Sequence, residues 1–167
     1  MQAWVQLYSV TGASAATLLG LLFVAVSIHA SGMSGAMHRN SKLLAEQAFQ
    51  NYLVVMLVSL LALFPTLSLG ELGYATLGLT AARTVWAGVR MYQAAMQPYG
   101  EGSRLQSLRR QFASLVGFAL LIVAAARMAR EWGDPRTMFA AAVVVLLFSA
   151  TTVAWQLLLR ISAEKRP

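Results

Sequence analysis

Long apolar segments alternate with short polar ones along the whole chain. Five segments contain about 20 mostly apolar residues, the length that an α-helix needs to cross the hydrocarbon core of a bilayer. They cover about residues 11–30, 51–69, 71–93, 111–128 and 137–159. Apolar residues run continuously through each segment instead of alternating over about 10 residues, which favours helices over the strands of a barrel. We therefore predict an all-α protein, a polytopic bundle of five transmembrane helices.

Residues that break helices separate these segments. Pro65 and Gly70, for example, lie between the second and the third. The segments and their short connections use up the chain, so we expect a single transmembrane domain over residues 1–167. Residues 1–38 contain neither Lys nor Arg, so the basic start of a signal peptide is missing and we expect the first segment to remain as a span.

The composition supports a membrane protein. Of the 167 residues, 58% are apolar and only 11% are charged, against about 25% charged residues in a soluble domain. The mean hydropathy is +0.62. A soluble domain of this size has too little interior to bury so much apolar surface, which excludes a soluble enzyme. The chain contains no cysteine, which excludes a disulfide scaffold, thiol catalysis and thiolate metal sites.

The basic residues lie at the ends of the apolar segments. There are 13 Lys and Arg against 6 Asp and Glu, a net charge of +7. Because the cations form no contiguous patch, they favour a membrane topology over nucleic-acid binding. Nine of them fall in the loops near residues 31–50 and 90–110 and in the C-terminal tail, and three fall on the other side. The positive-inside rule then predicts an outer N-terminus and a cytoplasmic C-terminus.

This topology predicts a location and a lipid partner. We expect a multi-pass protein of the bacterial inner membrane, with a basic cytoplasmic face suited to anionic lipids. The Ala- and Arg-rich, Lys-poor composition indicates a bacterium with a GC-rich genome.

Arg83 is the one charge predicted near the middle of a span. A charge at that depth costs about 2.5–3.5 kcal/mol, so Arg83 should face the bundle, a cavity or a partner subunit. Arg90 follows seven residues later, on nearly the same helix face. One interpretation is an anion or headgroup site, or a gating charge. The other is a structural arginine that bonds backbone carbonyls or pairs with Glu46, which would reach Arg90 more easily.

Small residues recur at a spacing of four in two segments. Gly12, Ala16 and Gly20 lie in the first, and Gly78 and Ala82 in the third. Such a stripe lets two helices approach closely. It predicts either packing within the chain or the interface of a homo-oligomer.

A polar stripe marks the fifth segment. Ser149, Thr152 and Gln156 share one face of the expected helix, near Thr151. Hydrogen bonds to neighbouring helices explain such a stripe, and a pore lining is the alternative.

No catalytic or cofactor motif is present in the sequence. The acidic residues all fall in loops or at helix ends, which argues against the usual proton relay. His29 and His38 lie at one end of the same segment, a poor arrangement for haem ligands. The chain has no metalloprotease, serine-hydrolase or P-loop motif. We expect neither enzyme activity nor a cofactor; an enzyme would require a pocket where Arg83, His29 and Glu46 converge.

Part of the chain resembles a group of bacterial proteins. Residues 12–27, GASAATLLGLLFVAVS, resemble the opening span of small uncharacterised multi-pass membrane proteins, some labelled "modulator of FtsH protease". The stretch LLAEQAFQNYLVVMLVSLLALFP is similar to theirs in rhythm, and the resemblance covers about residues 4–66. It implies a non-enzymatic partner of a membrane protease and contributes no catalytic residues.

These observations favour a non-catalytic accessory or modulator subunit of a membrane protein complex. Its partners would be the bilayer and other subunits or further copies of itself. The alternative is a small homo-oligomeric ion channel or transporter with Arg83 near the conduction path.

Overall fold

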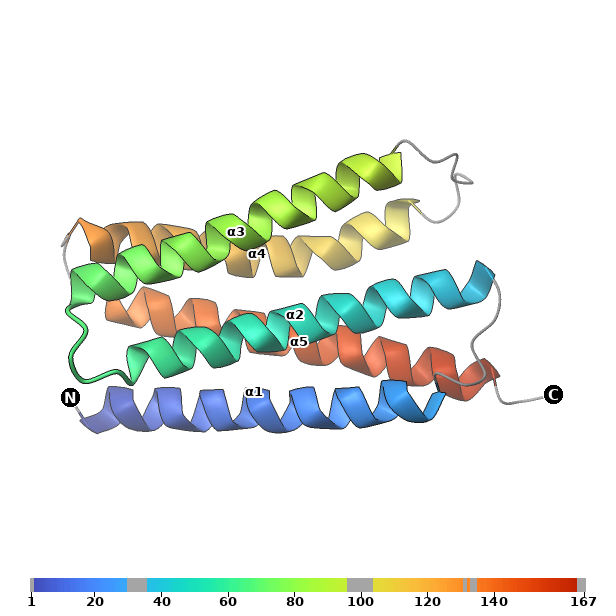
Figure 1. Ribbon diagram of the computed structural model, residues 1–167, viewed down its shortest axis with the longest axis horizontal. Helices are drawn as coiled ribbons and strands as arrows, with labels where there is room; N and C mark the ends of the chain where they lie inside the picture. The colour runs from blue at the N-terminus through green and yellow to red at the C-terminus, as the bar shows by residue number, and fades with distance from the viewer. Residues whose placement is uncertain (1, 30–35, 96–103, 131, 133–134, 165–167) are drawn as a thin grey trace. The chain divides into compact units, whose positions relative to one another are not determined.

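Five α-helices make up most of the part of the chain that the structure describes (Figure 1). The computed structural model describes the backbone of residues 2–29, 36–95, 104–130, 132 and 135–164, and the side chains of residues 4–28, 44–85, 116–130, 132 and 135–159. The helices are α1 (Gln2–His29), α2 (Ala36–Ala62), α3 (Leu69–Ala95), α4 (Arg104–Ala129) and α5 (Arg136–Glu164). The prediction of an all-α protein with five helices is confirmed.

Three of the helices are long and apolar enough to cross a membrane. Their apolar segments are Trp4–Ile28, Leu44–Ala62 and Arg136–Leu159, within the part of the chain whose side chains are described. In α4 the described apolar segment, Val116–Ala129, is shorter, and α3 is not among these helices. The chain is therefore a multi-pass membrane protein with three candidate spans. Five spans and the orientation stay predictions.

The second span lies earlier in the chain than its hydropathy predicts. The sequence predicted a span over about residues 51–69, whereas α2 ends at Ala62. Residues 64–67 form a turn in which the Leu67 amide donates to the Phe64 carbonyl at 3.4 Å. Pro65 takes the second position of this turn, where its fixed φ is favourable and its missing N–H costs nothing. The apolar residues after Ala62 therefore belong to a turn and not to the helix.

The helices form two compact units. The first unit contains residues 1–63 and 143–167, and the second contains residues 64–142. In the first unit α1 packs against α2, and in the second α3 packs against α4. Both pairs run antiparallel (Figure 1). Helix α5 contributes its first turns to the second unit and the rest to the first.

Buried residues in the first unit recur at helical spacing. In α2 and α5 they include Leu44, Ala48, Tyr52, Val55, Val58, Leu146, Ala150, Val153 and Leu157. The apolar windows of these two helices are each 44% buried, but that of α1 is only 22% buried. Helix α1 consequently exposes large apolar side chains along much of its length: Val5, Val10, Leu21, Phe23, Val24 and Ile28.

Helices α1 and α2 approach each other closely at two small residues, Gly12 and Ser59. The Thr11 hydroxyl donates to the Leu7 carbonyl at 2.9 Å and lies 3.3 Å from the Ser59 hydroxyl. The two hydroxyls thus form a hydrogen bond between α1 and α2. A Cβ at Gly12 would lie 3.1 Å from the Ser59 Cβ, so the glycine permits this approach.

We expect a large side chain at Gly12 to separate α1 from α2. In Gly12→Leu the new side chain meets Ser59, whereas Gly20→Leu places the same side chain where nothing lies within 4 Å. Overpacking of this kind costs about 1–3 kcal/mol. Thermal unfolding in mild detergent should therefore show a lower midpoint for Gly12→Leu than for Gly20→Leu. Equal midpoints would contradict the described contact.

Helix α3 begins with a capping box. The Ser68 amide donates to the Glu71 carboxylate at 2.8 Å, and the Glu71 amide donates to the Ser68 hydroxyl at 3.3 Å. The Ser68 hydroxyl also donates to the carboxylate at 2.8 Å. Two free amides at the helix start are thereby satisfied reciprocally. These hydrogen bonds favour the charged carboxylate, so the pKa of Glu71, an exposed residue in the first turn of α3, is lowered.

The lowered pKa predicts a loss of stability in acid. A carboxyl group whose pKa falls on folding stabilises the protein above its unfolded-state pKa, about 4.3 for glutamate. That contribution disappears as the pH falls through the lower folded-state pKa. The midpoint difference between wild type and Glu71→Gln should therefore be present at about pH 7 and shrink below about pH 4. A difference that does not change with pH would contradict the role of the charge.

Small residues also bring α3 and α4 together in the second unit. A Cβ on Gly73 would lie 2.5 Å from the Ala129 amide nitrogen and 2.7 Å from the Ala125 carbonyl oxygen. Ala125 is fully buried. The backbones of the two helices thus pass each other with no side chain between them, the kind of approach that small residues permit in membranes.

Candidate functional site

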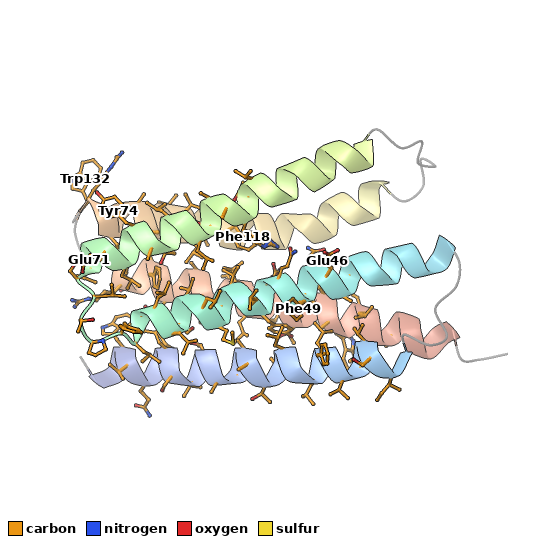
Figure 2. All side chains as sticks on the ribbon, viewed as in Figure 1. Glu46, Phe49, Glu71, Tyr74, Phe118 and Trp132 are labelled. Carbon is orange, nitrogen blue, oxygen red and sulfur yellow. The ribbon has the colours of Figure 1, made fainter. Side chains whose placement is uncertain are left out.

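Arg83 lies against an aromatic ring in the second unit. Its Cζ is 4.5 Å from the centroid of Phe118, which projects from α4 (Figure 2). This distance is within the roughly 6 Å range of a cation–π interaction. Arg83 is half-buried and Phe118 is buried. The ring faces the guanidinium with its negative π surface, so α3 and α4 together provide a favourable environment for this charge.

Threonines precede and follow Arg83 on α3. The Thr80 hydroxyl donates to the Thr76 carbonyl and the Thr84 hydroxyl to the Thr80 carbonyl, both at 2.8 Å. These donors therefore bond their own helix, as threonine does in transmembrane helices. The Thr76 hydroxyl is itself buried and has no hydrogen-bond partner among the described residues.

Glu46 and Arg90 are the other two charged candidates. Glu46 belongs to the first unit and Arg83 to the second. The side chain of Arg90 lies outside the described residues. A pair between Glu46 and either arginine therefore stays a prediction from the sequence. The side chains of His29 and His38 also lie outside the described residues.

Glu46 borders a groove between α1 and α2. The groove has a volume of about 240 Å³ and is open to the surface, and its lining surface is apolar. Three residues of each helix line it: Leu22, Phe23, Val26, Ala45, Glu46 and Phe49. Because the lining is apolar, Glu46 contributes the methylene groups of its side chain. Phe49 and Glu46 are on successive turns of α2 (Figure 2).

The small residues of the two predicted stripes lie in different surroundings. Gly12 is buried against Ser59, whereas Ala16 and Gly20 are exposed. In α3, Gly78 and Ala82 are exposed, and a Cβ at Gly78 would meet nothing within 4 Å. The close contact of α3 within this chain is instead at Gly73.

The polar stripe of α5 also divides between buried and exposed positions. Ser149 is buried, and its hydroxyl has no hydrogen-bond partner among the described residues. Thr152 and Gln156 are exposed, and the Thr152 hydroxyl donates to the Ser149 carbonyl at 2.8 Å. The cross-helix bond in this region comes from Tyr52 of α2, whose hydroxyl donates to the Thr151 hydroxyl at 3.2 Å.

Exposed aromatic residues mark one end of the α3–α4 pair. Tyr74 is 65% exposed and Trp132 is 66% exposed. Both lie at the end where α3 begins, close to the Glu71 cap (Figure 2). Tyrosine and tryptophan concentrate where a membrane meets water, since their rings are apolar and their tips polar. This end of the pair therefore has the composition of a membrane interface.

The capping box, the close contact at Gly73 and the apolar groove were not predicted from the sequence. The capping box at Ser68 and Glu71 was visible as a Ser-x-x-Glu pattern before an apolar segment. Gly73 has no such signal, because a glycine does not reveal which helix passes beside it. The apolar groove depends on the distance between two helices and has no local signature either.

Comparisons with protein-family models, with curated proteins and with solved structures found no match for this chain. The resemblance of residues 4–66 to proteins labelled as protease modulators therefore stays a prediction. The helices and their apolar windows define the class: an all-α, multi-pass membrane protein whose surface contacts the lipid bilayer.

Proposed function

We propose that the protein is a non-catalytic accessory or modulator subunit that binds other proteins in a bacterial inner membrane. The observation that carries the proposal is the surface of α1. This helix is apolar enough to span a membrane, yet its window is only 22% buried within the chain. It presents an exposed, largely apolar flank that another transmembrane helix can cover. Ala16 and Gly20 on that flank allow a close approach.

The proposal includes five spans, with the N-terminus outside and the C-terminus in the cytoplasm. Helices α3 and α4 contain 27 and 26 residues, or about 40 Å at 1.5 Å per residue, which exceeds a hydrocarbon core of about 30 Å. The contact of Arg83 with Phe118 supports a span in α3 despite its charge. The aromatic residues Tyr74 and Trp132 support an interface at one end of the pair.

Single cysteines test the spans and the orientation, because the chain contains no other cysteine. With five spans and an outer N-terminus, Thr66→Cys should react with an impermeant maleimide from outside and Gly100→Cys only from the cytoplasm. With three spans formed by α1, α2 and α5, both cysteines would react from the same side. Labelling of Thr66→Cys from the cytoplasm alone would contradict the orientation.

The composition of the native complex tests the function. The full chain, extracted in native lipid particles or mild detergent, is analysed by native mass spectrometry and peptide identification. A stoichiometric second protein is the expected result. A species that contains only copies of this chain would contradict the accessory role and support the alternative.

That alternative is a small homo-oligomeric channel or transporter. The exposed Thr152 and Gln156 favour it, because polar side chains on a span are stabilised when copies of the chain surround a polar path. In a channel, Arg83→Gln should change ion flux at normal expression. Unchanged flux in reconstituted vesicles would remove Arg83 from the conduction path.

A further inference from the structure

The groove between α1 and α2 lies within the membrane part of the first unit. Its α1 wall, Leu22 to Val26, belongs to the apolar window Trp4–Ile28, and its α2 wall, Ala45 to Phe49, belongs to Leu44–Ala62. Both walls therefore lie within about two turns of the window ends. The part of a lipid acyl chain nearest its headgroup lies at this depth.

The groove follows from the way the two helices pack. They touch at Gly12, which lies against the small side chain of Ser59. In an antiparallel pair, ten residues beyond Gly12 is Leu22 and ten residues before Ser59 is Phe49. Both residues line the groove, about 15 Å along the helices from this contact. The groove and the close contact thus lie at different levels of the same helix pair.

The volume of the groove restricts its occupant. A helix about 10 Å across fills more than about 400 Å³ in each turn of 5.4 Å, and the groove offers about 240 Å³. The groove therefore admits a slender group and not a whole turn of a second helix. Water is disfavoured because the lining surface is apolar and offers no hydrogen bonds.

We propose that this groove, lined by Leu22, Phe23, Val26, Ala45, Glu46 and Phe49, holds one acyl chain of a membrane phospholipid. The inference rests on the proposed membrane insertion of α1 and α2. A hydrocarbon chain is slender and apolar, and lipid is the medium that surrounds both walls. Phe23, which is 64% exposed, and Phe49, which is 39% exposed, stand at its open side and contact the chain there.

Photolabelling from within the bilayer tests the proposal. The full chain is reconstituted into phosphatidylglycerol vesicles whose acyl chains carry a diazirine, irradiated, and mapped by peptide mass spectrometry. Labelling at residues 22–26 and 45–49 should exceed that at Val144 and Phe148 several-fold. These two are exposed apolar residues of α5 outside the groove. Equal labelling of all exposed positions would show bulk lipid contact only and overturn the proposal.

A matched pair of variants provides the control. Ala45→Phe places a ring in the groove, and Ala13→Phe places the same ring on the exposed face of α1. We expect Ala45→Phe to reduce labelling of the α1 wall several-fold and Ala13→Phe to leave it unchanged. Unchanged labelling in a folded Ala45→Phe protein would overturn the proposal. The map of the unmodified chain remains decisive if that variant does not fold.

The experiment distinguishes failure of the acyl-chain site from failure of membrane insertion. A chain that does not span the bilayer would give no adducts at any of these positions, which would overturn the proposed function as well. Adducts on α5 without adducts in the groove would overturn the acyl-chain site alone. The second result is also expected if a side chain of a partner protein occupies the groove.

Discussion

Replacing Gly73 with alanine is expected to force α3 and α4 apart and to lower the free energy of unfolding by about 1–3 kcal/mol. The new Cβ would lie 2.5 Å from the Ala129 amide nitrogen and 2.7 Å from the Ala125 carbonyl oxygen. Both atoms belong to the backbone of α4, so no side chain can rotate away to make room. The helices themselves must shift, and the packing around the buried Ala125 changes with them.

Gly78→Ala is the matched control on the same helix. A Cβ at Gly78 meets nothing within 4 Å, and alanine is favoured over glycine in a helix by about 1 kcal/mol. The control should therefore be neutral or stabilising. Unfolding of both variants is compared by titration with a denaturing detergent, followed by circular dichroism. Similar effects at the two glycines would contradict the close α3–α4 contact.

Replacing Phe118 with alanine is expected to cost about 3–5 kcal/mol of unfolding free energy, because the ring is buried and its removal leaves a cavity. Part of that cost comes from the lost cation–π contact with Arg83, whose Cζ is 4.5 Å from the ring centroid. A double-mutant cycle with Phe118→Leu and Arg83→Met isolates this part. We expect a coupling of about 0.5–2 kcal/mol.

Arg127→Met provides the control for this cycle. Arg127 is exposed on α4, nine residues beyond Phe118, or about 13 Å along the helix. Effects at that distance should add within about 0.5 kcal/mol. Additivity between Arg83 and Phe118 as well would show that the cation–π contact does not stabilise the protein.

Arg83→Gln separates a structural role from a functional one. If Arg83 is structural, the variant should lose stability but still bind its partner at normal expression. Loss of partner binding in a protein that remains folded would instead assign Arg83 to recognition. The contact with Phe118 supports the structural role, because it provides the charge with a favourable environment within the chain.

The sequence predicted the number of helices better than their ends. Segments predicted at 11–30 and 111–128 correspond to the longer helices Gln2–His29 and Arg104–Ala129. Hydropathy reports only the residues suited to hydrocarbon, whereas an α-helix continues until a breaker or a cap ends it. The helix that ends at Ala62 shows the converse, since apolar residues after it enter a turn at Pro65.

By itself, the sequence determined that this is an all-α, multi-pass membrane protein without cysteine chemistry. Composition and the length of apolar segments suffice for this, because a backbone in lipid must satisfy its hydrogen bonds within each helix. Only the tertiary structure decided which small residues are packing contacts. Gly12 and Gly73 lie against neighbouring helices while Gly20 and Gly78 face open space. Spacing along one helix does not reveal which helix passes beside it or how closely. For the same reason, the ring beside Arg83 and the groove between α1 and α2 emerged only when the helices were placed side by side.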